Sequence, residues 1–265
     1  MNAVVEASAI SFAVRGRTLV DKVFLRLEPG RLVAVVGPNG AGKSTLFRLL
    51  TGECASSGGE IYYSGAPLAS LPPWKLAEKR AVMAQSAMLS FPFRAHEVAR
   101  LGLAVVGRRL APAQVETILA RSLASAGVID LADRNYQTLS GGEQQRVRFA
   151  RALCQLWAGQ AVGEGLALFL DEPTASLDLE HQLSIMNAAR AIAREGVAVI
   201  AIVHDLNMAA TFAQEMIALS GGRVVAQGHP ASVITEDFVE TVFRVRLPVR
   251  RDIEAGLPFI VPQGN

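Results

Sequence analysis

Uninterrupted apolar runs, each ended by glycine or by polar residues, form the strongest pattern in this chain. Three such runs cover residues 31–36, 166–170 and 197–203. A strand with one solvated face alternates polar and apolar residues, so continuous runs predict parallel strands that are buried on both faces. The last two runs end in Asp171-Glu172 and His204-Asp205. Because ligands of open α/β sheets bind at the carboxyl ends of strands, these polar residues are candidates for a functional site.

Alternating apolar positions near the start of the chain predict a second kind of sheet. Between residues 4 and 28, small or polar residues alternate with Ile10, Phe12 and Val14, and then with Val23, Leu25 and Leu27. This period favours antiparallel strands. Near the other end, Gly221-Gly222 within LSGGRVVAQG predicts a tight hairpin, followed by a helical tail and a strand-like end.

A long segment between the first two runs has a mostly helical pattern. It covers residues 86–157, with Pro92, Pro112 and Gly127 as breaks. Its last helix, EQQRVRFARALCQLW, carries one apolar face made of Val147, Ala150, Cys154 and Trp157. We therefore expect an inserted helical subdomain.

Composition excludes several classes of protein. The chain has 265 residues, 51% hydrophobic and 19% charged, with a formal net charge of +2. This balance is globular, and it gives neither the high charge of a disordered chain nor the basic footprint of a nucleic-acid binder. The mean hydropathy is +0.30, yet no run approaches the roughly 18 apolar residues of a membrane-spanning helix. The N-terminus carries no secretion signal, so we expect a chain that stays in the cytosol.

The cysteines and histidines give no pattern of a disulfide framework or a metal site. Cys54 and Cys154 lack CxxC spacing, so we expect packing roles for both. The 4 histidines are scattered, which argues against a zinc site.

A glycine-rich loop follows the first run and fits the pattern GxxxxGK[ST]. Its residues are Gly37, Pro38, Asn39, Gly40, Ala41, Gly42, Lys43, Ser44 and Thr45. The buried strand before it and the helical stretch 43–51 after it are the context that a phosphate-binding loop requires. Glycines let backbone N–H groups face the phosphates, Lys43 reaches the β- and γ-phosphates, and Ser44 offers its hydroxyl to Mg²⁺. The alternative is a glycine-rich turn with an exposed lysine.

The carboxylates that end the second run stand where a nucleotide site needs them. Asp171 would help to hold Mg²⁺ through water, and Glu172 would polarise the attacking water. Such a pair alone is equally consistent with solvated loop acids. The glycine-rich loop favours the catalytic interpretation.

The segment LSGGE, from Leu139 to Glu143, opens the last helix of the inserted segment. Ser140 as N-cap and Glu143 three residues later form the pattern of a capping box. With Gly141 and Gly142 at its mouth, the same helix start suits an anion such as a γ-phosphate. A purely structural cap is the alternative, and the two interpretations are compatible.

These motifs, in this order and spacing, resemble those of the ATP-binding cassette (ABC) transporter ATPases over roughly residues 5–230. The glycine-rich loop is similar to Walker A, 166–172 to Walker B with Glu172 as catalytic glutamate, and 139–143 to the signature. Gln85 resembles the Q-loop glutamine, Asp178 ends a D-loop-like SLD, and His204 resembles the switch histidine. The resemblance implies an α/β fold: a RecA-like P-loop NTPase core (1–85 and 158–227), an N-terminal antiparallel β-subdomain, an inserted α-helical subdomain (86–157) and a C-terminal tail (228–265).

The resemblance also implies how the site works. ATP and Mg²⁺ are bound in a head-to-tail homodimer, between Walker A of one subunit and the signature and D-loop of the other. Gln85 contacts Mg²⁺ and the attacking water, and His204 contacts the γ-phosphate. The alternatives are an ordinary strand-end glutamine and a satisfied loop histidine, with Asp205 as the cap of the next helix. The family's adenine-stacking aromatic is replaced by Val14, and Phe12 is either its substitute or a core residue.

Within the family, three segments resemble those of importers of iron chelates, cobalamin and above all haem. They are residues 80–103 and, further along the chain, GGEQQR and AxxLxQLW. This implies two copies of a permease, a periplasmic haem-binding protein reached through the permease, and a place on the cytoplasmic face of the inner membrane, with no nucleic-acid partner. The alternatives are a ferric-siderophore or cobalamin importer and a soluble ABC ATPase that acts on ribosomes or DNA. A GTP-binding switch is disfavoured because the NKxD motif is absent.

Two surfaces remain to be assigned. Phe91, Phe93 and Val98 are expected contacts of the permease's coupling helix, although a buried turn at Phe91-Pro92-Phe93 is equally consistent. Four basic residues near the C-terminus are expected to form a solvated face in preference to a lipid or partner contact: Arg244, Arg246, Arg250 and Arg251.

Overall fold

A six-stranded sheet forms the centre of the computed structural model, which describes residues 3–84, 91–164, 167–252 and 256–261. Its strand order is β10-β9-β3-β8-β7-β6. The bounds are β3 (Leu32–Val36), β6 (Arg80–Met83), β7 (Ala167–Asp171), β8 (Ala198–Ile202), β9 (Glu215–Ser220) and β10 (Arg223–Gly228). The neighbours from β9 to β6 run parallel, whereas β10 forms an antiparallel hairpin with β9. The predicted parallel strands and hairpin are confirmed.

The two faces of this sheet pack into two separate cores. In β3, Leu32, Ala34 and Val36 belong to the core that contains the long helices, while Val33 and Val35 belong to the core around α1 (Lys43–Leu50). Every residue of β3 and β8 is buried. The uninterrupted apolar runs therefore reflect burial on both faces.

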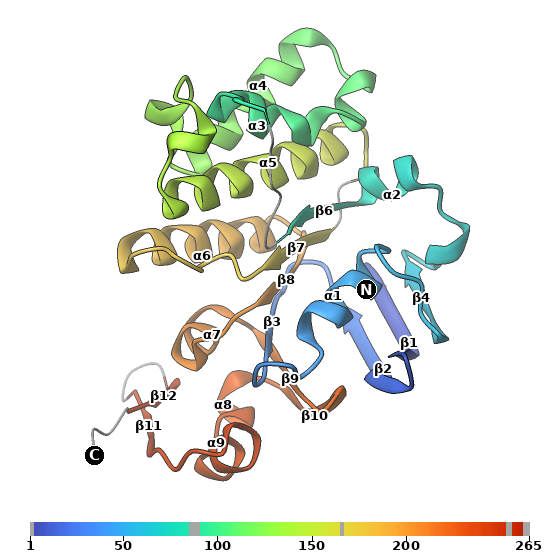
Figure 1. Cartoon of the computed structure of the whole chain (residues 1–265), viewed down its shortest axis with the longest axis vertical. Helices are drawn as coiled ribbons and strands as arrows, with labels where there is room; N and C mark the ends of the chain where they lie inside the picture. The colour runs from blue at the N-terminus through green and yellow to red at the C-terminus, as the bar shows by residue number, and fades with distance from the viewer. Residues whose placement is uncertain (1–2, 85–90, 165–166, 253–255, 262–265) are drawn as a thin grey trace.

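A second sheet covers α1 on its far side, in the order β2-β1-β4-β5 (Figure 1). Its strands are β1 (Val5–Val14), β2 (Arg17–Leu27), β4 (Gly58–Tyr63) and β5 (Ala66–Pro67), all antiparallel to their neighbours. Phe47 of α1 packs edge-on against Phe169 of β7, with ring centroids 5.7 Å apart. The predicted antiparallel sheet is confirmed.

The inserted segment lies at one end of the molecule (Figure 1) and contains α3 (Ala95–Arg100), α4 (Pro112–Ser125) and α5 (Gly141–Ala161). The predicted apolar face of α5 is buried. The helix continues to Ala161, four residues beyond the predicted end at Trp157, because Ala158 and Gly159 are also buried and Gly163, with φ of +84°, is the first left-handed position. The predicted subdomain boundary at 157 falls inside this helix.

The remaining elements flank these layers. The helices are α2 (Pro73–Lys79), α6 (Leu179–Arg194), α7 (Leu206–Phe212), α8 (Pro230–Val233) and α9 (Glu236–Phe243). Short 3₁₀ turns are η1 (Leu68–Ser70), η2 (Leu101–Leu103), η3 (Val106–Arg109), η4 (Ile129–Leu131) and η5 (Tyr136–Thr138), and β11 (Val249–Arg251) pairs with β12 (Pro258–Ile260). Asn207 Nδ2 donates to Ile260 O at 3.2 Å and Ile260 N donates to Asn207 Oδ1 at 2.7 Å, which ties the C-terminal strand to α7.

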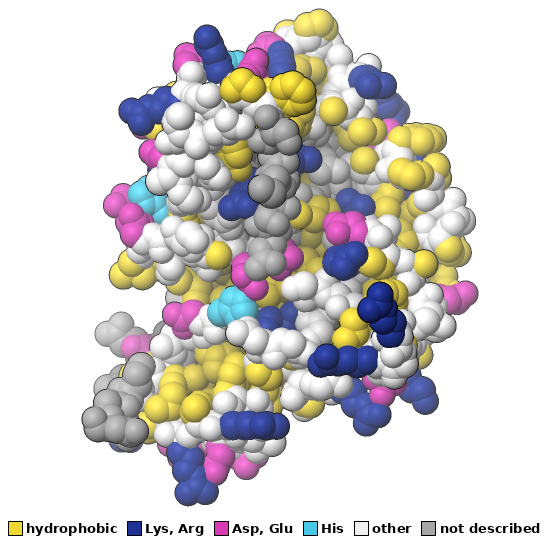
Figure 2. Space-filling view, viewed as in Figure 1, with side chains coloured by type: hydrophobic (Ala, Val, Ile, Leu, Met, Phe, Trp, Pro, Cys, Tyr) yellow, Lys and Arg dark blue, Asp and Glu magenta, His cyan; other side chains and the backbone are white. Residues whose placement is uncertain are grey.

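The surface mixes charges of both signs, as Figure 2 shows for one face. The four arginines near the C-terminus are exposed, as expected for a solvated face. Among the helices of the described chain, none is both long enough and apolar enough to cross a membrane.

Candidate functional site

The glycine-rich loop joins β3 to α1 and packs tightly against two other strands. Gly37 has φ of +146°, and a Cβ on it would lie 2.1 Å from the carbonyl oxygen of Leu219. Gly42, the N-cap of α1, has φ of +103°, and a Cβ there would lie 2.4 Å from the carbonyl oxygen of Leu19. Both positions therefore require glycine, because a side chain would be strained and would clash with backbone.

Lys43 begins α1 with its side chain turned back into the loop. Its Nζ donates to Gly37 O at 2.7 Å and to Pro38 O at 3.0 Å. Burial lowers the pKa of Lys43, while the charges of Glu172 and Asp171 raise it. The residue is 6% exposed, so the alternative of an exposed lysine in a glycine-rich turn is wrong.

Asp171 is the last residue of β7, and its partly buried carboxyl group lies near other acidic side chains, where a cation would be bound favourably. Burial raises the pKa of its carboxyl group to about 6, with a further rise from Glu172 and Glu53, against the opposing effect of His204 and Lys43. Its Oδ1 atom is buried and has no hydrogen-bond partner among the described residues. A water bound to Mg²⁺ would supply that hydrogen bond, and carboxylate and hydroxyl oxygens are ligands that Mg²⁺ accepts, so Asp171 fits its predicted role.

Glu172 adopts a backbone conformation that is rare for a residue other than glycine. Its φ is +50°, and strained positions of this kind cluster at functional sites. Gln145 of α5 donates to Glu172 O at 2.8 Å, which holds this turn from the helical segment. The carboxylate Oε1 lies 2.6 Å from His204 Nε2. The sequence predicted roles for these two residues and did not predict this contact.

His204 follows β8 and precedes a well-formed helix cap. Asp205 Oδ1 accepts hydrogen bonds from Asn207 N at 2.7 Å and Met208 N at 3.2 Å, so the predicted cap is confirmed. The imidazole itself is paired with Glu172, a residue of the candidate site, rather than with groups of its own loop. Among the described residues, no cluster of three metal-ligating side chains includes any histidine.

A cavity of about 330 Å³ unites the loop with the ends of β7 and β8. Its lining comprises Arg17, Leu19, Asn39, Gly40, Ala41, Gly42, Lys43, Ser44, Thr45, Glu172 and His204. Sequence reasoning missed Arg17 and Leu19, whose only signal is their place after the turn that ends at Gly16. Val14 is 44% exposed, and Phe12 packs against the core around α1. Neither lines the cavity, so the structure favours a core role for Phe12.

The signature-like segment begins α5 with a complete capping box. Ser140 N donates to Glu143 Oε2 at 2.7 Å, and Glu143 N donates to Ser140 Oγ at 3.3 Å. Hydrogen bonds from the Ser140 backbone and side chain to the carboxylate lower the pKa of Glu143. The predicted cap is confirmed, and it leaves Gly141 and Gly142 at the open end of a 21-residue helix, where backbone N–H groups favour an anion.

This segment belongs to a second cavity of about 310 Å³. Its lining comprises Ser140, Gly141, Gly142, Glu143, Arg146, Ser176, Leu177, Asp178 and His181. Asp178 caps α6, because its Oδ1 accepts from His181 N at 2.9 Å and lies 2.6 Å from His181 Nδ1. The two cavities have no described residue in common, so the predicted nucleotide residues that line them form two separate groups. Asp171 lines neither of these cavities and instead faces a neighbouring one beside Phe47 and Glu53.

Several predictions fall elsewhere. Gln85 and Leu166 lie outside the described residues. Val98 is 1% exposed, so its prediction as a surface contact is wrong: α3 turns this face into the helical core. Phe91 is 70% exposed and packs edge-on with Phe93, at 6.3 Å between centroids. Cys154 is buried, which raises the pKa of its thiol to about 11, as expected for a packing role.

Comparison with known proteins gives consistent matches. A family model described as ABC transporter matches residues 20–175. The hemin import ATP-binding protein HmuV of Rhodopseudomonas palustris is 48% identical over 264 residues, which cover 99% of this chain and 96% of the relative. The protein of the same name from Agrobacterium fabrum is 43% identical over 266 residues, covering 98% and 99%. The structure of cbiO1 from Clostridium perfringens, part of the ABC transporter complex cbiONQ, has a TM-score of 0.74 at 25% identity and covers 91% of this chain and 94% of its own.

Proposed function

The chain belongs to the ABC transporter family, and on this premise we propose that it is the ATP-hydrolysing subunit of an importer that carries haem across the cytoplasmic membrane. The observation that carries the choice of substrate is the similarity, over nearly the full length, to relatives named as hemin import ATP-binding proteins. Importers of ferric siderophores or cobalamin are the second candidate, because they would use the same ATPase chemistry. The division into core, helical subdomain and tail is part of the proposal.

The geometry supports ATP hydrolysis at the first cavity. Lys43, which now donates to two carbonyl groups of its own loop, would turn to the phosphate oxygens. Ser44 and Asp171 would hold Mg²⁺, which supplies positive charge to the phosphates in the transition state. Glu172 orients the attacking water and accepts its proton, and His204 fixes the Glu172 carboxylate and reaches the γ-phosphate. Gln85 keeps its proposed role beside Mg²⁺ and the water.

Two copies of the chain would complete the site. The first cavity offers the loop and Glu172, while Ser140, Gly142 and Asp178 line a different cavity of the same chain. In a head-to-tail homodimer with twofold symmetry, the second cavity of each subunit would face the first cavity of the other. The open glycines at the start of α5 would then donate their N–H groups to the γ-phosphate.

The remaining partners follow from the importer proposal. Two permease copies would contact the dimer, with the exposed Phe91 as the leading contact residue. A periplasmic haem-binding protein would deliver substrate to the permease, so this chain needs no haem ligand. The chain would lie on the cytoplasmic face of the inner membrane.

The test is to identify the permease by capture with a variant that keeps ATP. Tagged Glu172→Gln chain is purified with ATP and Mg²⁺ from detergent-solubilised native membranes, with the same variant without nucleotide as control. The binding protein that pairs with the recovered permease is then titrated with haem while its absorption spectrum is recorded. A saturable haem band shift supports the proposal. Binding of cobalamin or a ferric siderophore in place of haem would assign that substrate to the importer and overturn the haem proposal. Recovery of ribosomes or DNA without a permease would overturn the proposed transport function.

A further inference from the structure

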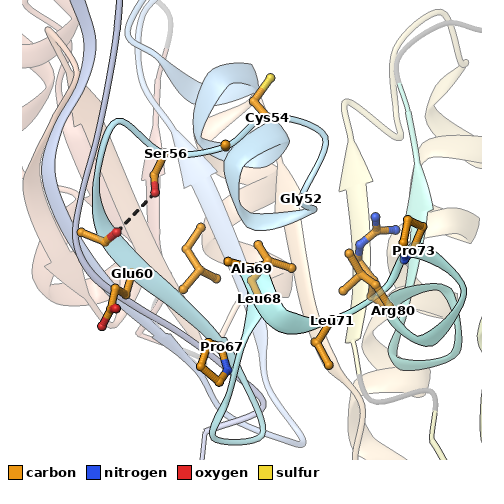
Figure 3. Close-up of a pocket in the computed structure, with 14 residues that line it drawn as sticks. Gly52, Cys54, Ser56, Glu60, Pro67, Leu68, Ala69, Leu71, Pro73 and Arg80 are labelled. Atoms are coloured by element: carbon orange, nitrogen blue, oxygen red, sulfur yellow. Dashed lines mark hydrogen bonds between the residues drawn. The ribbon is translucent and has the colours of Figure 1, made fainter.

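A third cavity, of about 390 Å³, lies away from both halves of the nucleotide site, and none of its described lining residues belongs to either half (Figure 3). It lies between the end of α1, β4, η1 and the start of α2. Its wall is mainly apolar, formed by Ile61, Pro67, Leu68, Leu71 and Leu76. A volume of about 300 to 1,000 Å³ with an apolar wall and few polar groups is typical of small-molecule sites.

The charged side chains of this cavity stand at its two ends. In Figure 3, Glu60 lies at one end and Arg80 at the other, beside Pro73. Glu60 accepts a hydrogen bond from the hydroxyl group of Tyr62. Arg80 Nε, in contrast, is buried with no hydrogen-bond partner in the described part of the chain. Burial lowers the pKa of Arg80, and the negative charge of Glu53 opposes this effect.

The basic residues around Arg80 are paired. Lys75 Nζ lies 2.9 Å from Glu78 Oε2, and Lys79 Nζ lies 2.8 Å from Glu164 Oε2. Within residues 3–84, 91–164, 167–252 and 256–261, no carboxylate oxygen lies within 4.0 Å of an Arg80 side-chain nitrogen, and the nearby Glu78 and Glu164 pair with the lysines instead. A buried guanidinium nitrogen without a hydrogen bond is costly, and an anionic ligand that accepts one from Arg80 Nε would offset the cost.

We propose that this cavity binds a small amphipathic monocarboxylate, with its head group on Arg80 and its apolar body against Leu68, Leu71 and Leu76. The planar guanidinium matches a carboxylate in geometry. A single cation, with Glu60 at the opposite end, favours a monoanion over a phosphate dianion. The cavity is also lined by Gly52, which follows the end of α1, and Arg80 itself is the first residue of β6.

The test compares two ligands that share an apolar body. Decanoate and 1-decanol are titrated into the full chain by isothermal calorimetry, without nucleotide. Wild type should bind decanoate saturably and at least tenfold more tightly than decanol. Arg80→Gln should weaken decanoate at least tenfold and leave decanol unchanged, because only the charged contact is removed. Equal affinity of wild type and Arg80→Gln for decanoate, or no saturable binding to wild type, overturns the proposal.

A second variant decides the matter if Arg80→Gln does not fold. Ala69 lines the cavity and is exposed, so Ala69→Phe fills the cavity without removing a core contact. It should abolish binding of both ligands while the thermal unfolding temperature stays near that of wild type. Unchanged decanoate affinity in a folded Ala69→Phe chain overturns the assignment of this cavity.

Discussion

His204 Nε2 lies 2.6 Å from Glu172 Oε1, although 32 positions separate the two residues in the chain. The register of the sheet produces this contact. Asp171 pairs with Ile202 across the parallel strands β7 and β8, so the residues that follow each strand emerge side by side. The carboxylate is held at the mouth of the glycine-rich loop, where an attacking water would need a base.

Replacement of Glu172 tests its role as the base. Glu172→Gln should lower ATP turnover by about 10² to 10⁴, the range for loss of one general base. ATP affinity should stay close to wild type, because the residues of the glycine-rich loop are unchanged. Steady-state phosphate release and equilibrium binding of ATP measure the two quantities. Turnover equal to wild type would rule out Glu172 as the base.

Replacement of His204 tests the contact itself. His204→Ala should lower kcat at least about tenfold with little change in KM for ATP, because Glu172 loses a group that orients its carboxylate in the transition state. The matched control is His96→Ala, whose ring contacts Ala132 O in the helical segment at 2.8 Å. A kcat unaffected by His204→Ala, or lowered equally by both changes, would contradict the positioning role.

The raised pKa of Asp171 predicts a dependence of stability on pH. Its value of about 6 exceeds the ordinary 3.8, so the folded chain binds this proton more tightly than the unfolded chain. The stabilising contribution of protonated Asp171 is full below about pH 4 and is lost as the pH rises through 6. Relative to Asp171→Asn, wild type should therefore gain free energy of unfolding between pH 7 and pH 5.

Denaturant titrations of both chains at the two pH values, in EDTA and without nucleotide, measure this difference. The Asn variant serves as the control, since it removes the titrating group and keeps the side-chain volume. A difference between the two chains that does not change with pH would show that the Asp171 carboxyl is solvated.

Glu78 joins the core to the helical segment through ion pairs. Its side chain is 2% exposed and contacts Arg109 of η3 and Lys75 of its own helix. Burial raises the pKa of Glu78, but the hydrogen bonds from Lys75 and Arg109 outweigh this effect and lower it. Glu78→Ala should lower the free energy of unfolding by about 1 to 2 kcal/mol, because hydrogen bonds to a charged group are lost in a buried setting.

The matched control is an exposed ion pair of the same kind. Glu116 pairs with Arg100 while 61% exposed, so Glu116→Ala should change the free energy of unfolding by no more than about 0.5 kcal/mol. Equal losses in both variants, measured in urea at pH 7, would contradict a special role for the buried carboxylate.

The parts of the site that depend on local sequence could be predicted. The loop from Gly37 to Thr45, the capping box at Ser140 and the cap at Asp205 each depend on neighbours within a few residues, so the pattern predicts them. The contributions of Arg17 and Leu19 could not be foreseen, because β2 meets the loop only after two sheets have packed around α1.

The sequence also did not predict which residues are buried and which have a strained backbone. Val98 and Phe91 were both expected at the surface, and only the packing of α3 on α5 decides that Val98 is buried, whereas Phe91, which precedes α3, is exposed. The left-handed conformation of Glu172 has no sequence signal, because the pattern at the end of the strand indicates a turn without specifying its backbone conformation. The end of α5 at Ala161 depends on the burial of Ala158 and Gly159.

A nucleotide site that needs two copies of the chain is tested most directly by the mass of the Glu172→Gln chain with and without ATP, measured by sedimentation equilibrium. We expect a 28.2 kDa monomer without nucleotide and a dimer with ATP. Adding Ser140→Arg to the same chain should prevent the dimer and leave ATP binding intact, because only the second cavity is altered. A chain that binds ATP and stays monomeric, or that dimerises despite Ser140→Arg, would contradict a nucleotide site completed by a second copy.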